Sequence, residues 1–211
     1  MVEYVCKGFP YKPELGCFGM ATSLLIHDNY NILFDTGNYG ARKRIIELLE
    51  SNKIDIVVIS HLHFDHCSNL DLFINKNIPI YISQKEFNDY FINKDNDCDL
   101  FSYFNMIYKK LNIKLVKRSC KVSNNCKLIF TKGHTNGHMS LVINDNTILA
   151  GDSLKTFNDY KDKNSYGNAV SKNDYLNTKK MIINKYQTIY CGHDGMIKDH
   201  KLYDRGDINE F

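Results

Sequence analysis

In Ser60-His61-Leu62-His63-Phe64-Asp65-His66, three imidazoles and one carboxylate occur within six residues. The segment follows Ile54–Ile59, whose β-branched run predicts a strand buried on both faces. Because side chains alternate along extended backbone, we expect His61, His63 and Asp65 to point one way, with Leu62 and Phe64 towards the core. A histidine cluster on a solvated loop would need neither the intervening apolar residues nor a buried strand before it. The pattern therefore predicts a divalent metal site.

Further candidate ligands follow other predicted strands, each beside a glycine that lets the backbone turn tightly. They are His134 after Leu128–Thr131, Asp152 after Thr147–Ala150, and His193 after Thr188–Cys191. Taken singly, each is compatible with a simple turn. Together with the histidine cluster they indicate a site assembled from loops at one edge of a rigid scaffold.

Apolar patterns elsewhere predict an α/β fold, in which layers of sheet are covered by helices. The other expected strands are Ser23–Ile26, Asn31–Phe34, Pro79–Ile82 and Ser140–Ile143. The expected helices are Ala41–Glu50, Glu86–Ile92 and Lys172–Asn184. No repeat, Gly/Ser linker or Pro-rich stretch divides the sequence, so a single domain over residues 1–211 is expected.

The composition is that of an ordinary globular protein, with 43% hydrophobic residues in 211. A net charge of +3 is too small to indicate a nucleic-acid partner. The seven cysteines are odd in number and irregularly spaced, which favours a reducing compartment over a disulfide framework. Neither a signal-peptide pattern nor an apolar run long enough to span a membrane occurs, so a cytoplasmic protein is expected.

The motifs and their order resemble the metallo-β-lactamase-fold hydrolase superfamily. The family's HxHxDH motif is matched by His61–His66, and its later ligands by His134, Asp152 and His193. Asp35, in Phe34-Asp35-Thr36-Gly37, matches the upstream family aspartate. The resemblance runs from about residue 20 to residue 195, and it implies a four-layer αββα sandwich with a dinuclear metal site at one edge.

The resemblance also implies a role for each residue of the site. One metal would be bound by His61, His63 and His134, the second by Asp65, His66 and His193, with Asp152 bridging the two. Outside the ligands, Asp35 is expected to orient a ligand histidine or the loop. His138 is expected either to support the ligands from behind or simply to begin a strand. Cys67 and Cys191 adjoin ligands but are not expected to bind metal.

This ligand set predicts a hydrolase that needs two divalent ions. Ions that share a water lower its pKa towards neutrality, so that hydroxide attacks an electrophilic carbonyl or phosphorus. Asp65 is the expected catalytic residue, which would orient the nucleophile and carry its proton. Zinc is the favoured metal, although imidazole and carboxylate ligands also accept iron or manganese.

The expected substrate is a small molecule with an ester, thioester or lactone bond. The motifs resemble those of quorum-quenching lactonases, which carry a tyrosine three residues past the bridging aspartate. Lys155 occupies that position here, and Tyr160 or Tyr166 is a candidate replacement. The similar glyoxalase-II branch is disfavoured, because too few residues follow His193 for its helical extension.

Two other functions stay open. The alternative is a phosphodiesterase or ribonuclease acting on RNA or DNA, which the basic segment Lys109–Lys127 would support as a phosphate-binding patch. A solvated face is the simpler interpretation of this segment. A non-catalytic, ligand-binding member is the third possibility, which the intact ligand set disfavours. The aromatic segment Phe87–Tyr108 is expected to form helix core or an oligomer contact, or else the lid of an apolar pocket.

Overall fold

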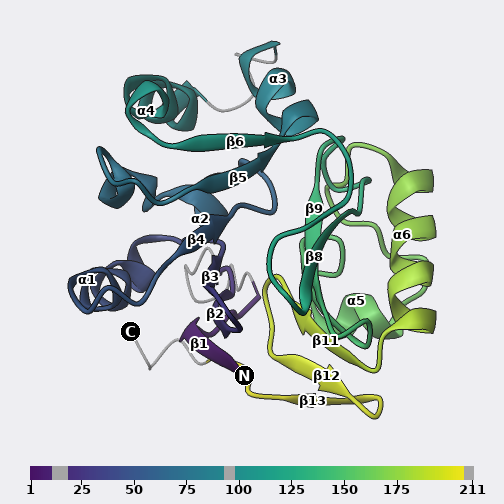
Figure 1. Cartoon of the computed structure of the whole chain (residues 1–211). Helices are drawn as coiled ribbons and strands as arrows, with labels where there is room; N and C mark the ends of the chain where they lie inside the picture. The colour runs from purple at the N-terminus through teal and green to yellow at the C-terminus, as the bar shows by residue number, and fades with distance from the viewer. Residues whose placement is uncertain (11–18, 93–97, 207–211) are drawn as a thin grey trace.

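Two β-sheets packed face to face form the centre of the computed structural model, which describes residues 1–10, 19–92 and 98–206 (Figure 1). The first sheet has six strands in the order β1-β2-β3-β4-β5-β6. They are β1 (Val2–Cys6), β2 (Ser23–His27), β3 (Asn31–Phe34), β4 (Ile56–Val58), β5 (Ile80–Ser83) and β6 (Ile113–Val116). β1 to β3 are antiparallel, whereas β3 to β6 run parallel.

The second sheet has seven strands in the order β13-β12-β11-β10-β9-β8-β7. They are β7 (Cys120–Lys121), β8 (Cys126–Phe130), β9 (Met139–Ile143), β10 (Thr147–Gly151), β11 (Thr188–Cys191), β12 (Met196–Lys198) and β13 (Lys201–Tyr203). Only the β10–β11 pair of this sheet is parallel. The helical segment between these two strands supplies the crossover that a parallel pair requires.

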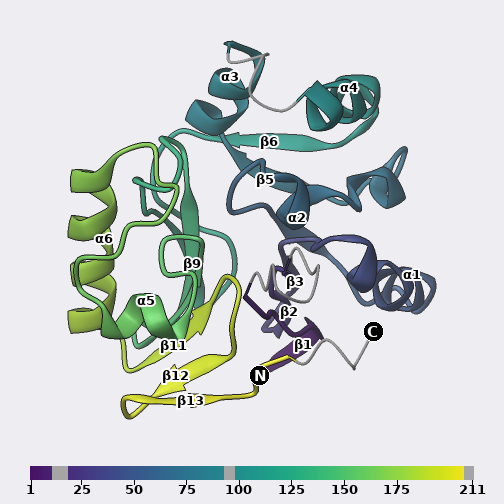
Figure 2. The ribbon, with the colours of Figure 1, turned by 180° about the vertical axis from the view of Figure 1, so that it is seen from behind.

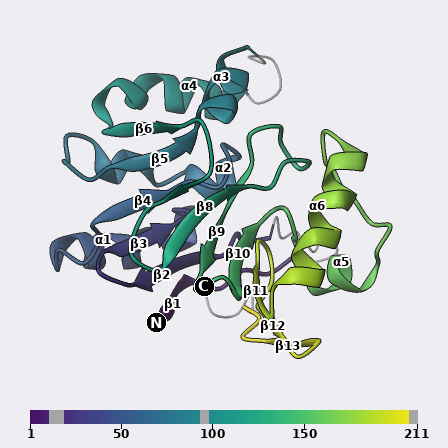
Figure 3. The same cartoon turned by 45° about the vertical axis from the view of Figure 1, so that its right-hand side comes forward.

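Helices cover the outer face of each sheet, as the views from the front and from behind both show (Figures 1 and 2). Those beside the first sheet are α1 (Arg42–Glu50), α2 (Phe64–Cys67), α3 (Gln84–Ile92) and α4 (Cys98–Ile107). Those beside the second sheet are α5 (Phe157–Lys161) and α6 (Lys172–Lys185). The layers therefore follow the order helix, sheet, sheet, helix (Figure 3), and the predicted αββα sandwich is confirmed.

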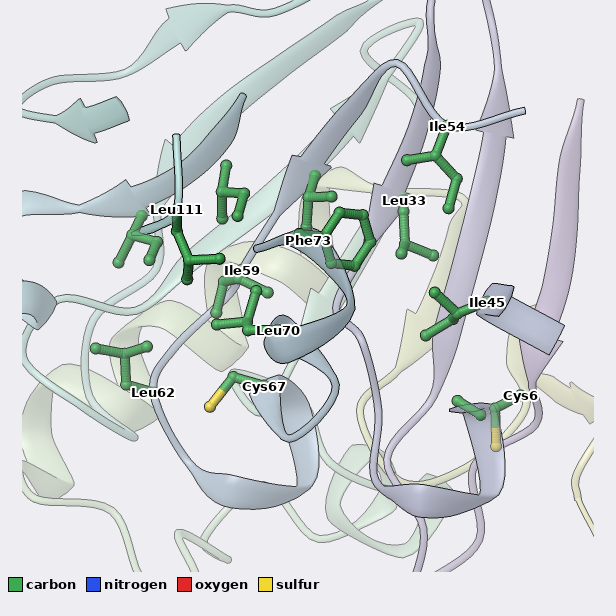
Figure 4. Packing of buried hydrophobic residues seen from close by; sticks show 14 of the residues in the cluster. Cys6, Leu33, Ile45, Ile54, Ile59, Leu62, Cys67, Leu70, Phe73 and Leu111 are labelled. Carbon is green, nitrogen blue, oxygen red and sulfur yellow. The ribbon is translucent and has the colours of Figure 1, made fainter. Parts of the chain in front are cut away.

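Three apolar cores separate the four layers. Leu24, Phe34 and Leu141 belong to the core between the two sheets, and Ile148 and Ile182 to the core under α6. The third core lies between the first sheet and its helices, where Phe73 packs among side chains of several strands and loops (Figure 4). Each sheet thus buries both faces, which explains the nearly continuous apolar runs of its central strands.

The histidine-bearing segment is anchored in the third core by its own apolar residues. Leu62 and Cys67 of this segment are both buried there (Figure 4). The expected alternation is wrong beyond His63, however, because Phe64–Cys67 forms the short helix α2. Asp65 consequently faces a different set of side chains from His61 and His63, and Phe64 is only partly buried.

Every strand and helix expected from the sequence is present; Asn31–Phe34 and Thr188–Cys191 have the predicted bounds, and the other elements have shifted ends. The predicted strand Ile54–Ile59 is ordered as a strand only over Ile56–Val58. Elements with weak patterns were missed, among them β1, β6 and the β12–β13 hairpin at the sheet edges. Edge strands are partly solvated, so their sequences lack the long apolar runs of central strands. In the described ranges, no helix is long and apolar enough to cross a membrane.

Candidate metal centre

The candidate ligands gather at one edge of the sandwich, because each follows the carboxyl end of a strand. His61 and His63 come after β4, His134 after β8, Asp152 directly after β10 and His193 after β11, while Asp65 and His66 lie in α2. The loop geometry predicted from the sequence therefore brings all seven side chains together. They form two groups, and within each group the donor atoms lie within 4.8 Å of one another: the first is His61, His63, His134 and Asp152, and the second is Asp65, His66 and His193.

Three imidazole nitrogens converge in the first group. His61 Nε2 lies 2.9 Å from His63 Nδ1 and 3.1 Å from His134 Nε2, and the last two atoms are 3.0 Å apart. All three side chains are largely buried, and burial lowers their pKa values, that of His134 to about 2. The rings are therefore neutral, which is the state that a metal requires of its ligands.

Asp65, His66 and His193 form the second group. His193 Nε2 lies 3.1 Å from Asp65 Oδ2, and His66 Nε2 lies 3.7 Å from the same oxygen. Although burial opposes the shift, Asp152 and Asp65 raise the pKa of His193 to about 9. Burial alone would raise the pKa of Asp65, but the neighbouring His66 and His193 outweigh burial and lower it. This group concentrates carboxylate charge that a cation would balance.

Asp152 lies between the two groups and presents one oxygen to each. Its Oδ2 lies 3.2 Å from His134 Nε2, and its Oδ1 lies 3.2 Å from His66 Nε2 and 3.3 Å from His193 Nε2. The carboxylate is almost fully buried, yet the charges of His193 and His66 outweigh burial and lower its pKa. A carboxylate so placed can contact two ions at once.

The donor set fits two divalent metal ions. Three neutral imidazoles cannot all satisfy one another by hydrogen bonding, because each offers only one N–H and one lone pair. Ligand nitrogens around a tetrahedral zinc ion lie about 3.3 Å apart, for Zn–N bonds of about 2.0–2.1 Å, close to the spacing of the three imidazole nitrogens. In addition, His66 Nε2 and Asp152 Oδ1 are buried and, although they lie 3.2 Å apart, neither makes a hydrogen bond of good geometry among the described residues. Metal coordination would satisfy both atoms.

Asp35 lies behind this centre, as the sequence led us to expect. Its Oδ2 is 2.7 Å from His66 Nδ1, and its Oδ1 accepts a hydrogen bond from the Ser60 backbone N–H at 2.7 Å. The Ser60 hydroxyl donates to Asp35 Oδ2 and lies 3.0 Å from His61 Nδ1. Ser60 thus supports His61 directly and His66 through Asp35. Because Ser60 is fully buried, its hydroxyl is inaccessible as a nucleophile.

His138 also lies behind the ligands rather than among them. Its Nε2 accepts a hydrogen bond from the Asp152 backbone N–H at 3.1 Å, and its Nδ1 lies 2.9 Å from Thr131 Oγ1. Burial lowers the pKa of His138 to about 3, so the ring is neutral and Nε2 keeps its lone pair. The geometry thus favours support of Asp152 over the simpler interpretation of a strand-start residue.

Three residues beside the centre make contacts that the sequence did not predict. Lys155 Nζ lies 3.1 Å from Asp152 Oδ2 and donates to Asn168 Oδ1 at 2.5 Å. Asp194 is fully buried and accepts from both Arg205 Nε and the Phe157 backbone N–H, which fixes the loop that carries His193. The third residue, Glu86, lies on α3. The structural role of Glu86 could not be predicted from the sequence, because its hydrogen-bond partners lie far away along the chain.

A glycine lets the loops approach one another at this edge. A Cβ atom at Gly192 would lie 2.4 Å from Asp152 Oδ1, a distance that real Cβ atoms do not adopt. The His193 loop can therefore pass beside the central carboxylate only with glycine at this position.

The other sequence-derived candidates lie elsewhere. Tyr160 does not approach the centre, since its hydroxyl is 2.5 Å from His200 Nδ1 beside the β12–β13 turn. The half-exposed ring of Tyr166 lies under Lys172 Nζ. Neither candidate metal group found among the described residues includes Cys67 or Cys191.

Comparison with known proteins places this centre in a family. The sequence model of the metallo-beta-lactamase superfamily matches residues 18–193. The chain belongs to this superfamily. The family match spans every candidate ligand, from His61 to His193, and the fold is that of its solved members.

The relatives of this metallo-beta-lactamase-fold chain include metallo-hydrolases. A probable metallo-hydrolase of Methanocaldococcus jannaschii is 28% identical over 205 residues, which is 90% of this chain and 95% of the relative. An N-acyl homoserine lactonase of a Bacillus species is 26% identical over 165 residues, and the match covers 72% of this chain and 62% of the lactonase. The chain is thus a hydrolase of the metallo-beta-lactamase fold.

A solved N-acyl homoserine lactone hydrolase has the same fold. That structure holds the product N-hexanoyl-L-homoserine at its catalytic metal centre. Its TM-score with this chain is 0.67 at 21% identity, over 83% of this chain and 82% of the other.

Proposed function

We propose that this chain is a dinuclear metal-dependent hydrolase that cleaves an ester, thioester or lactone bond in a small molecule. The observation that carries the proposal is the position of Asp152, with one carboxylate oxygen 3.2 Å from His134 Nε2 and the other facing His66 and His193. This arrangement offers two ions separate ligand sets and one shared carboxylate. We infer the ligands to be His61, His63 and His134 for one ion, Asp65, His66 and His193 for the second, and Asp152 for both.

Zinc is the metal that the donor set suits best, since imidazole nitrogen and carboxylate oxygen are its common ligands in catalytic sites. Iron and manganese fit the same ligands, and their availability can decide between them. When bound, two such ions lower the pKa of a shared water and polarise the bond to be cleaved. The first group is buried more deeply than the second, whose Asp65 side chain is 35% exposed.

Asp65 is the residue proposed to act on the nucleophile. Its side chain is the more exposed of the two carboxylates of the centre, and its Oδ2 is held 3.1 Å from His193 Nε2. The lowered pKa keeps the carboxylate ionised, so it can accept a hydrogen bond from water and orient it. In that position Asp65 can also receive the proton that the water loses and pass it to the leaving group.

Lys155 is proposed to bind the substrate oxygen on which negative charge develops. Its Nζ is held beside Asp152 and by Asn168, so its charge lies at the edge of the centre. A fixed N–H donor aimed at a developing oxyanion is a strong contribution to catalysis. Lys155 occupies the position at which the lactonases that the motifs resemble carry a tyrosine.

Apolar side chains beside two of the ligand-bearing segments favour an organic substrate. The exposed ring of Tyr39 contacts Phe64, the neighbour of His63, with ring centroids 5.7 Å apart. Val170 is also exposed, and its backbone N–H donates to the His134 carbonyl. A few polar groups between apolar walls typify sites for small molecules.

A nucleic-acid substrate is less compatible with this geometry. Part of the basic segment Lys109–Lys127 lies at β7 and the start of β8, whereas His134 follows the end of β8. Lys127 is the second residue of the five-residue strand β8, so the rest of that strand, at about 3.3 Å per residue, lies between it and the metal edge. Lys127 is also paired with Asp145, which offsets its charge. The segment therefore fits the solvated face expected from the sequence better than a phosphate track to the centre.

The aromatic segment contributes core rather than a lid in its described part. Phe104 is buried and its ring contacts those of Phe87, Tyr90 and Tyr108. Part of the predicted segment, at residues 93–97, lies outside the described residues. We further propose that residues 1–211 form one domain, because each sheet buries its inner face only against the other.

Purified protein with measured metal content should be assayed on lactone, thioester and phosphodiester reporters. We expect carbonyl substrates to be hydrolysed, activity to vanish with a chelator, and activity to return when zinc or manganese is restored. Asp152→Ala should lose metal and activity but keep its fold by circular dichroism. Full turnover by metal-free protein would refute the proposal, and strong phosphodiester cleavage with inert lactones and thioesters would favour the alternative.

A further inference from the structure

Glu86 is a buried carboxylate outside the candidate ligand set, near the start of α3. Only 7% of the residue is exposed, and burial raises the pKa of its side chain. A buried carboxyl group needs hydrogen-bond partners to offset its desolvation. Its partners come from two loops that are distant in sequence. Oε1 accepts from the Leu62 backbone N–H at 3.0 Å, and Oε2 accepts from the Thr135 hydroxyl at 2.6 Å.

Both partners adjoin proposed metal ligands. Leu62 lies between His61 and His63, and Thr135 directly follows His134. A single carboxylate therefore connects the two loops whose imidazole nitrogens converge to within 3.1 Å. It contacts none of those nitrogens, so its influence on the ligands passes through the backbone.

The His134 loop also packs directly against the backbone of Glu86. A Cβ atom at Gly137 would lie 2.2 Å from the Glu86 backbone nitrogen, and the Gly137 backbone N–H bonds to the Glu86 carboxylate. The loop thus approaches α3 as closely as glycine permits. Contact at the backbone and at the carboxylate fixes the distance between helix and loop.

The opposite group of ligands is supported by other residues. His66 is held by Asp35, and the loop of His193 is fixed through the neighbouring Asp194. Among the hydrogen bonds described for Glu86, each partner belongs to the loops of the three-histidine group or to Ser83 at the end of β5. Ser60 and Asp35 together contact ligands of both halves, through His61 and His66, whereas the described contacts of Glu86 lie on the three-histidine side.

We propose that Glu86 is a positioning residue for the three-histidine half of the metal centre, and that it sets the metal affinity of that half alone. The inference rests on the proposed dinuclear function. Without the carboxylate, the Leu62 and Gly137 N–H groups lose their acceptor, and the two loops separate from the converged arrangement. Groups that orient metal ligands from behind typically change metal affinity about 10–100-fold when removed.

The test measures zinc affinity by competition with a chromogenic chelator. Glu86→Ala is placed in a His193→Ala background, which retains the three-histidine half, and in a His63→Ala background, which retains the other half. We expect about 10-fold or greater weakening in the first background and no change in the second. Glu86→Gln, which keeps one acceptor oxygen, should recover part of the affinity. Glu47→Ala, on the exposed face of α1, should have no effect.

Several outcomes separate this role from general stability. Equal weakening in both backgrounds, or none in either, would overturn the proposal. If Glu86→Ala does not fold, Thr135→Val removes one hydrogen bond and leaves the carboxylate in place. That variant should weaken the three-histidine half by a smaller factor, and unchanged affinity would overturn the proposal. Failure of the unmodified protein to bind two zinc ions would instead refute the dinuclear function, and Glu86's role with it.

Discussion

Asp35 holds His66 from behind: the carboxylate oxygen Oδ2 lies 2.7 Å from the ring nitrogen Nδ1, and both side chains are fully buried. The contact fixes the orientation of the ring, so that the opposite nitrogen, Nε2, faces Asp65 and Asp152. Asp35 achieves this with φ at 56°, a left-handed backbone conformation that aspartate tolerates better than most residues. Unusual backbone at a buried carboxylate agrees with a functional role.

Asp35→Ala is therefore expected to weaken metal binding in the half that contains His66. The ring would lose the acceptor that orients it, and zinc affinity should fall about 10–100-fold. Titration calorimetry of the metal-free protein with zinc measures this change. Asp35→Asn keeps the size and one oxygen acceptor, so its loss should be smaller. Unaltered zinc affinity in the alanine variant would show that Asp35 serves folding only.

Lys155 provides a test of how the substrate is held. Lys155→Met removes the charge beside Asp152 but keeps most of the aliphatic chain, so metal content should stay at the wild-type level. We expect kcat/KM for a lactone or thioester to fall about 100-fold, as for loss of a donor to a developing oxyanion. Lys155→Arg should retain a larger share of the activity. Equal kcat/KM in all three proteins would exclude a role for the lysine in hydrolysis.

Most of the metal centre could be predicted because its residues are close in sequence or follow recognisable strands. His61, His63 and His66 share one short segment, and His134 and Asp152 each follow a strand with a clear apolar pattern. The backbone conformation within that segment was harder to predict. The alternation rule holds only while the chain is extended, and α2 begins at Phe64. The division of ligands into two groups came from the family resemblance, and the alternation rule alone would have placed Asp65 wrongly.

The supports of the centre could not be read from the sequence. Glu86 is one acidic residue near the start of a helix, where acidic residues are common. Its contacts with Leu62 and Thr135 exist only because the sandwich brings α3 between two loops. In the same way, the lysine pattern of α6 gives no sign that Lys179 is buried, since lysine is normally exposed. Tertiary contacts of single polar residues leave no periodic signal.

Asp28 connects the two sheets at the edge away from the metal centre. A substitution there can therefore change the free energy of unfolding without changing metal binding. Its Oδ2 accepts from the Ser123 hydroxyl at 2.5 Å and from the Asn125 backbone N–H at 2.8 Å. These hydrogen bonds, that of Ser123 first, lower the pKa of Asp28 from 3.8 to about 2. The lowered pKa means that the ionised form stabilises the folded state. The benefit is complete above about pH 4 and is lost as the pH falls through about 2.

Asp28→Asn should accordingly be less stable than the wild type at neutral pH but not at low pH. Solvent screens this exposed carboxylate, so we expect a difference of about 1 kcal/mol in the free energy of unfolding at pH 6. The difference should shrink between about pH 4 and pH 2. Urea unfolding across this range measures it, and zinc affinity at neutral pH should be unchanged. A difference that is constant with pH would contradict the assigned role of the charge.

Lys179 and Asp159 form a buried ion pair beneath α6, close to the loop that carries Lys155. Lys179 is 1% exposed, and its Nζ lies 2.8 Å from Asp159 Oδ1 and 3.0 Å from the Asp162 carbonyl oxygen. Asp159 also accepts from the Tyr175 hydroxyl and, at 3.3 Å, from the Lys155 backbone N–H. Removal of one partner would leave the other buried without its counter-charge.

Lys179→Met should therefore lower the free energy of unfolding by about 3–5 kcal/mol, measured by urea denaturation. Lys180→Met, at an exposed position on the same helix, is the matched control and should change it by less than about 0.5 kcal/mol. Adding Asp159→Asn to Lys179→Met removes the uncompensated charge, so the double variant should lose less than the two single variants together. Strictly additive losses would mean that the two charges do not interact. Because Asp159 also holds the Lys155 backbone, Asp159→Asn should in addition lower kcat/KM more than Lys179→Met at temperatures where both variants are fully folded.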